Sequence, residues 1–146
     1  AENLTLYEHF NGTGAWMDSE SMGHFLEHTR LMFVMERGNE LWLAPLVTDI
    51  WTEDGMCVSV DNAPTRFGQV SYEIRSHVDK GYIEAEINPP TRTAPEELVI
   101  RLRHPLGKSM REAKADGLVH IEFDANKEII RIKRPAGDKI RIRALY

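Results

Sequence analysis

The sequence has few of the features that identify several common protein classes. It contains one cysteine, Cys57, so no disulfide can form within the chain, and cysteine counting gives no indication of a secretory compartment. Cys57 lies in a strand-like run, which predicts a small hydrophobic core residue. No apolar run approaches the roughly 20 residues that a membrane-spanning helix needs. A membrane is therefore not expected as a partner.

Motifs for several kinds of catalysis and binding are also missing. The chain has no G-x-S-x-G nucleophile elbow and no glycine-rich phosphate loop of the Walker or dinucleotide type, and no cofactor is expected. Residues 127–143 are basic, with seven lysines and arginines against two acidic residues, but they contain no aromatic side chain on which a base could stack. Nucleic acid is therefore not an expected partner, and the basic run predicts a solvated or docking face.

From about residue 51 onward the sequence alternates between apolar and polar residues, as half-buried strands do. Turn signals such as Asp61–Pro64 separate the runs. The fold class predicted is mainly β, an antiparallel β-sandwich of about eight strands preceded by a short helical segment. The predicted strands are Met56–Val60, Gln69–Ser76, Gly81–Ile87, Leu98–His104, Met110–Ala115, Val119–Phe123, Glu128–Lys133 and Lys139–Ala144.

The strand around Ile100 carries arginines on its predicted wet face. Arg101 and Arg103 alternate there with apolar neighbours, and Glu84 and Glu86 occupy the wet face of another predicted strand. Cross-strand pairs of opposite charge contribute about 0.2–1 kcal/mol each. We therefore expect the two arginines to pair with the two glutamates in a scaffold strand that does not contact substrate.

A helix is predicted from about Ser19, because Met22, Phe25 and Phe33 recur at helical spacing. Arg37–Asn39 contains the glycine typical of a helix end. A second apolar side is formed by Leu31, Val34 and Met35. A helix that is apolar on two sides needs partners on both, and one of these is expected outside this sequence.

The helix carries an H-x-x-E-H pattern at His24, Glu27 and His28, in which two histidines one turn apart could hold zinc while the glutamate activates water. Such a site needs a further carboxylate ligand from a helix, and the rest of the chain is predicted to form strands. The pattern therefore favours polar positions on a packed helix, and no metal site is predicted.

Trp16, Asp18 and Glu20 are the candidate carbohydrate-binding residues, because an aromatic ring and two carboxylates lie beside a glycine-containing loop. Glycoside hydrolysis needs two carboxyl groups about 5–10 Å apart in a cleft, and one short stretch does not form a cleft. Helix capping and loop solvation remain alternative roles for these residues. No catalytic residue is assigned.

Several segments together resemble the C-terminal end of large bacterial proteins of the six-hairpin glycosidase type: Leu31–Glu36, Leu41–Pro45, Trp51, Val58–Gly68 and Ile100–Pro105. The resemblance implies that residues 1–45 are a helical segment ending an (α/α)6 toroid, and that residues 46–146 are the appended β-sandwich domain. It also implies a chain excised from a longer glycoside hydrolase, with a periplasmic or extracellular location. No catalytic residue of that family can be matched to a position in this sequence.

Two functions follow as expectations. The first is a non-catalytic C-terminal accessory domain that braces the catalytic toroid of the same parent chain, its expected partner. The second is an autonomous carbohydrate-binding module, for which carbohydrate is the partner and exposed aromatic residues on one sandwich face are required. Tyr72 and Tyr82 are the only aromatic residues well inside the predicted strands, and Tyr72 has the parity of a core residue.

Overall fold

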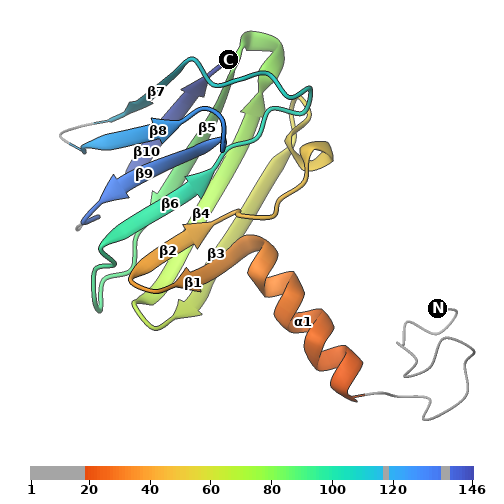
Figure 1. The fold of residues 1–146 in the computed structure, drawn as a ribbon, viewed down its shortest axis with the longest axis vertical. Coiled ribbons are helices and arrows are strands. Elements are labelled where there is room, and N and C mark those ends of the chain that lie inside the picture. Colours follow the sequence, from red (N-terminus) through yellow and green to blue (C-terminus); the bar gives the residue numbers. More distant parts are fainter. Residues whose placement is uncertain (1–18, 117–118, 136–138) are drawn as a thin grey trace, which may run out of the picture.

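The computed structural model describes residues 19–116, 119–135 and 139–146, and these form two five-stranded sheets and one α-helix (Figure 1). The first sheet has the strand order β1 (Val34–Arg37), β2 (Glu40–Leu43), β6 (Glu97–Arg101), β9 (Ile129–Lys133) and β8 (Ile121–Asp124). The second sheet has the order β3 (Cys57–Thr65), β4 (Gly68–His77), β5 (Tyr82–Asn88), β10 (Ile140–Leu145) and β7 (Glu112–Ala115).

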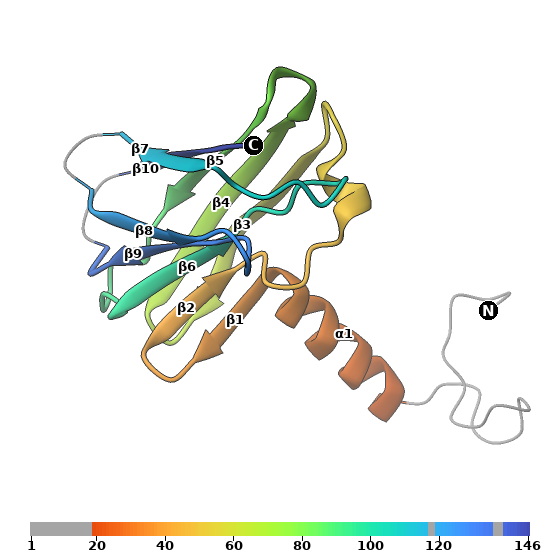
Figure 2. The ribbon, with the colours of Figure 1, turned by 45° about the horizontal axis from the view of Figure 1, so that its top comes forward.

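The predicted β-sandwich is confirmed. The two sheets face each other, and one continuous core lies between their inner faces (Figure 2). Leu41, Leu98 and Ile132 form one cross-strand row of the first sheet, and all three are fully buried. Alternation along each strand produces this arrangement, because successive side chains point to opposite faces. Each of the eight predicted strands is present, with ends shifted by a few residues.

The N-terminal part of the sandwich differs from expectation. The helix α1 (Ser19–Phe33) ends four residues before Arg37, and residues 34–43, expected to belong to the helical segment 1–45, form the β1–β2 hairpin. Gly38, with φ +56°, occupies the hairpin turn instead of a helix end. Leu41 and Leu43 point into the core with Trp42 between them on the outer face, a strand pattern that fixes this segment in the first sheet.

The C-terminal end of α1 is fixed to the sandwich by hydrogen bonds. The Phe33 carbonyl accepts from the Ala44 N–H at 2.8 Å and from the Tyr72 hydroxyl at 2.9 Å, and the Met32 carbonyl accepts from the Leu46 N–H at 3.2 Å. The last carbonyls of a helix have no partner within the helix, so these contacts satisfy them. None of the helices in the described residues is long and apolar enough to cross a membrane.

The predicted turn at residues 61–64 is a β-bulge within one long strand. The β3–β4 register shifts between Val60 and Ala63, and Asn62 has φ +53°. Asparagine tolerates this left-handed conformation better than most residues. The strand accommodates Pro64 because β3 is the edge of its sheet, where a proline removes no hydrogen bond to a second neighbour. The β3–β4 turn instead follows Thr65.

The expected pairing of Arg101 and Arg103 with Glu84 and Glu86 is wrong. Both arginines bind Glu128, at 2.8 Å from Arg101 Nη2 and 3.1 Å from Arg103 Nε to the same Oε2 atom. The strand β6 that carries Arg101 lies in the first sheet, whereas β5 with the two glutamates lies in the second. The alternation of apolar and polar residues identified the solvent-facing side of each strand correctly. It gave no information on which sheet each strand joins.

His104 is a buried titratable group in the core, with 2% of its surface exposed. Its Nδ1 atom accepts a hydrogen bond from the Leu106 N–H at 3.0 Å, which requires the neutral ring, and its ring packs edge-on against Tyr146 at 5.0 Å. Burial first, and the positive charge of Lys108 second, lower the pKa of His104 below its ordinary value of 6.5.

The lowered pKa predicts that mild acid destabilises the fold. Well above pH 6.5 His104 is neutral in both the folded and the unfolded state. As the pH falls below 6.5, the unfolded chain binds this proton first, so the free energy of unfolding decreases by at most about 1.4 kcal/mol per pH unit until the folded pKa is passed. Urea unfolding at several pH values between 7.5 and 5 measures this slope, the change in the free energy of unfolding per pH unit. This pH range lies above the one in which carboxylates titrate.

The His104→Gln variant should lose this slope, whereas His120→Gln should keep it, because the His120 side chain is 75% exposed. An unchanged slope in His104→Gln would contradict the assignment.

Candidate functional site

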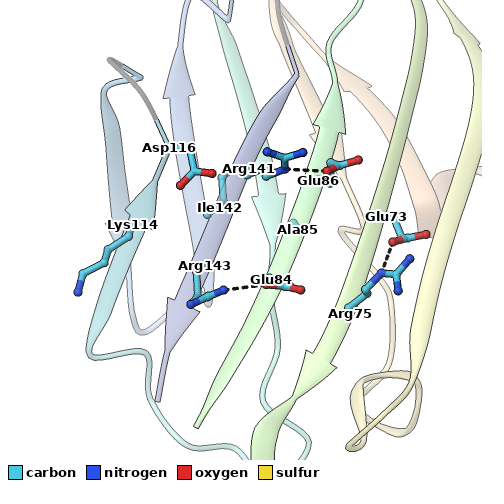
Figure 3. A pocket seen from close by; sticks show the side chains of 10 residues that line it. All are labelled: Glu73, Arg75, Glu84, Ala85, Glu86, Lys114, Asp116, Arg141, Ile142 and Arg143. Carbon is cyan, nitrogen blue, oxygen red and sulfur yellow. Dashed lines mark hydrogen bonds and ion pairs between the residues drawn. The ribbon is translucent and has the colours of Figure 1, made fainter. Parts of the chain in front are cut away.

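A polar groove of about 550 Å³ crosses the outer face of the second sheet (Figure 3). Ligand sites in proteins commonly have volumes of about 300–1,000 Å³. Eight charged side chains from four neighbouring strands line the groove, and the register of the sheet arranges them in two rows. The lining charged residues are Glu73 and Arg75 from β4, Glu84 and Glu86 from β5, Arg141 and Arg143 from β10, and Lys114 with Asp116 from the β7 side.

The first row, which we call the basic row, carries three cations and one anion. Arg75 lies opposite Glu84 on β5, Glu84 opposite Arg143 on β10, and Arg143 opposite Lys114 on β7. Arg143 Nη2 lies 3.1 Å from Glu84 Oε2, and His77 Nε2 lies 3.4 Å from the other carboxylate oxygen. One oxygen of Glu84 therefore accepts a hydrogen bond from Arg143, and the other lies beside the His77 ring.

The second row, which we call the acidic row, has the opposite balance. Glu73 lies opposite Glu86 and Glu86 opposite Arg141, while the Asp116 N–H donates to the Arg141 carbonyl at 3.0 Å. Like charges directly opposite each other, as in Glu73 and Glu86, are unfavourable without compensating cations. Arg75 compensates Glu73 by an ion pair through its Nε atom, and Arg141 Nε binds Glu86 at 2.9 Å.

These contacts favour the charged forms of the groove residues. Hydrogen bonds from Lys139 first, and from Arg141 next, lower the pKa of Glu86 below its ordinary value. The pKa of Arg141 is raised mainly by its hydrogen bond to Glu86, and that of Arg75 by its hydrogen bond to Glu73. Glu86, Arg141 and Arg75 are therefore held in their charged forms, which suits binding of polar ligands more than proton transfer.

Donors in the groove exceed the free acceptors. Arg75 and Arg141 each use one guanidinium N–H, on Nε, and Arg143 uses Nη2. A guanidinium has five N–H donors, so most donors of these three groups have no partner within the described chain. Both oxygens of Glu86 and one oxygen of Glu84 already accept hydrogen bonds. The groove therefore offers mainly N–H groups to a ligand.

No open aromatic platform is formed in the groove by the residues that the structure describes. Tyr82 lies on the outer face of β5, but the Arg143 guanidinium lies 4.4 Å from its ring centre and the His77 ring lies 4.9 Å away. Tyr72 is buried, as its position in the alternating pattern of its strand predicted. A carbohydrate-binding module that stacks sugars on exposed rings of this face finds no support here.

A second candidate surface is apolar and begins on α1. Met22, Phe25 and Leu26 lie on one stripe of the helix and are exposed, with 56% of Phe25 and 64% of Leu26 accessible. At its C-terminal end Phe33 stacks on Trp51, with ring centres 5.5 Å apart. The exposed side of the helix is thus its first apolar stripe, whereas Val34 on the second side is buried. The sequence had left open which of the two sides lacks a partner.

The apolar surface continues beside the helix into a hollow of about 380 Å³ at the edge of the second sheet. The residues that line the hollow are Phe33, Trp51, Met56, Cys57, Val58 and Ser59. Cys57 is exposed there, so its expected core position is wrong. The next residue, Val58, occupies the buried face of β3, which places Cys57 on the outer face.

The candidate residues from the N-terminal part of the sequence are not brought together with either surface. Trp16 and Asp18 lie outside the described residues. Glu20 lies in the first turn of α1, and its side chain is not among those that the structure describes. The described residues contain no cluster of three histidine, cysteine or carboxylate side chains suited to a metal ion. His24 and His28 instead stack with ring centres 6.0 Å apart.

Comparison of the chain with protein-family models, with curated proteins and with solved structures gives no match. What the protein does must therefore be inferred from the two surfaces described above.

Proposed function

We propose that this chain is a non-catalytic accessory domain of a carbohydrate-active enzyme and that it braces a helical catalytic domain of the same parent protein. The helical domain docks on the apolar surface formed by α1 and the adjoining hollow. The observation that carries the proposal is the exposed apolar stripe of α1 at Phe25 and Leu26, on a helix whose other end is fixed to the sandwich.

The helix needs a partner for its own stability. It has 15 residues, a length at which an isolated helix is marginal in water, so most of its stability must come from tertiary packing. Its main contact among the regular elements is with β1, at its C-terminal end. The N-terminal half extends away from both sheets in both views (Figures 1 and 2). A helix so placed is stabilised when another domain covers its apolar stripe.

The size of the apolar surface supports docking. Full burial of a Phe or Leu side chain contributes about 1.5–3 kcal/mol, and Phe25 and Leu26 retain more than half of their exposure. Ile50, with 60% exposed, and Met56 extend the surface beside Trp51 and the hollow. Exposed apolar patches, where they are large, mark interaction sites in proteins. The resemblance to six-hairpin glycosidases supports a helical toroid as the partner.

The proposal predicts that Leu26 is covered in the complete parent protein. In a Cys57→Ser background, a Leu26→Cys variant of the 146-residue chain should react rapidly with a thiol reagent. In the complete protein the reaction should slow by at least about tenfold, which corresponds to a docking stabilisation of ~1.4 kcal/mol or more. Labelling rates followed by mass spectrometry measure the difference.

Lys127→Cys is the matched control. Its side chain is 70% exposed and lies in the turn between β8 and β9, at the edge of the first sheet opposite β1. Its labelling rate should be the same in both proteins. Equal rates for Leu26→Cys in the two proteins would show that α1 is not the docking surface.

A further inference from the structure

We propose that the polar groove on the second sheet is a binding site for an acidic oligosaccharide, one whose sugar units carry carboxylate groups. The inference goes beyond the bracing role and does not require that α1 docks on another domain. It rests on the arrangement of charges in two rows across β4, β5, β10 and β7, and on the surplus of N–H donors that this arrangement leaves.

The basic row is suited to a carboxylate. Arg75 and Arg143 lie on either side of Glu84, and Lys114 follows on the next strand. Arg75 is ion-paired with Glu73, Arg143 with Glu84, and Lys114 with Glu112. What the row offers a carboxylate is therefore the set of N–H donors that these pairs leave unused. Guanidinium groups bind carboxylates in paired, charge-assisted hydrogen bonds, and Arg143 still has its Nε and Nη1 donors available.

The acidic row is suited to hydroxyl groups. It holds Glu73, Glu86 and Asp116. Glu73 is paired with Arg75, and Glu86 is paired with Arg141 and Lys139. The Asp116 carboxylate and the second oxygen of Glu73 make no hydrogen bond within the described residues, so they can accept from ligand hydroxyls. A sugar acid presents both kinds of group on one ring, a carboxylate for the basic row and hydroxyl donors for the acidic row.

The shape and chemistry of the groove disfavour other ligands. Among the described residues that line it, only Ala85 and Ile142 are apolar, and both are buried in the core, so an apolar ligand gains little by burial. The groove lies on the face of the sheet, while strand addition by a peptide needs a free edge. A peptide laid across the face would also lack apolar pockets for its side chains. An extended polar chain with carboxylates spaced along it fits best.

Calorimetric titration with trigalacturonate tests the proposal, and its methyl ester is the matched probe without charge. The chain should bind trigalacturonate about tenfold or more tightly than the ester, with affinity that decreases as salt is raised. The Arg143→Gln variant should lose about tenfold in affinity or more, the loss expected for a charge-assisted hydrogen bond. Lys133→Gln removes a half-exposed, ion-paired cation from the first sheet and should leave affinity unchanged.

Three outcomes would overturn the proposal. The first is the absence of binding to trigalacturonate by a chain that unfolds cooperatively. The second is equal affinity for the acid and its ester, which would remove the role of the basic row. The third is equal binding of triglutamate, which would assign the groove to acidic groups in general and not to a glycan. Thermal unfolding of Arg143→Gln verifies that a loss of affinity is not a loss of fold, and Arg75→Gln gives an independent variant on β4.

Discussion

Replacing Tyr146 by alanine is expected to lower the free energy of unfolding by about 3–5 kcal/mol, the range for truncation of a large buried aromatic side chain. Tyr146 is 7% exposed, and its hydroxyl donates to the Leu102 carbonyl at 2.7 Å. Its ring also forms one wall of the His104 environment. The truncation thus removes packing from the core and a hydrogen bond between the second sheet and the segment that follows β6.

Tyr146→Phe separates these two contributions, because it keeps the ring and removes the hydroxyl. It should cost about 1–3 kcal/mol, since the Leu102 carbonyl is left without this donor. Urea unfolding of both variants and of Tyr82→Ala measures the free energies. Tyr82 lies on the outer face of the sandwich and is only partly buried, so its truncation should cost less than that of Tyr146. Equal losses in the free energy of unfolding for Tyr146→Ala and Tyr82→Ala would contradict the placement of Tyr146 in the core.

The fold class could be predicted from sequence because strand parity is a local property. Ile83, Ala85 and Ile87 are buried while Glu84 and Glu86 face outward, as their alternation indicated. The β1–β2 hairpin was missed because Val34–Arg37 follows a helical apolar pattern without interruption. The segment becomes a strand when Leu41 and Leu43 pair beside β6, a tertiary contact that outweighs local preference.

Strand β6 shows a second limit of local reasoning. Alternation predicts that Val99 faces solvent, yet its exposed fraction is 0%. On the outer face Val99 lies between Trp42 of β2 and Arg131 of β9, whose side chains are long enough to cover it. Arg131 also binds Glu40 and Glu97, which lie side by side on β2 and β6. The parallel pairing of β2 with β6 creates this cover and is not visible in either strand alone.

The polar groove could not be predicted for the same reason. The outward charges of β4, β5 and β10 were recognisable, and each was interpreted as part of a wet face. Their organisation into a basic row and an acidic row depends on the strand order β4–β5–β10–β7. This order brings Arg75 and Lys114, which are distant in the sequence, into one row. The apolar stripe of α1 was recognisable from spacing alone, because helical periodicity is local.

Replacing Ile100 by alanine should lower the free energy of unfolding by about 2–5 kcal/mol, the range for large-to-small changes in a packed core. Ile100 has an exposed fraction of 0% and lies on the central strand of the first sheet, between Leu43 of β2 and Ile130 of β9. The sheet cannot collapse into the space that is left, because strands on both sides fix the backbone of β6.

Phe123→Ala is the matched control for Ile100→Ala, because Phe123 continues the same cross-strand row opposite Ile130 but lies on the edge strand β8 with 43% of its surface exposed. Although more atoms are removed, the edge is already partly hydrated, so the cost should be smaller than at Ile100. Urea unfolding of the two variants compares them directly. A larger cost at Phe123 than at Ile100 would place the centre of the core at the β8 edge and contradict the strand order of the first sheet.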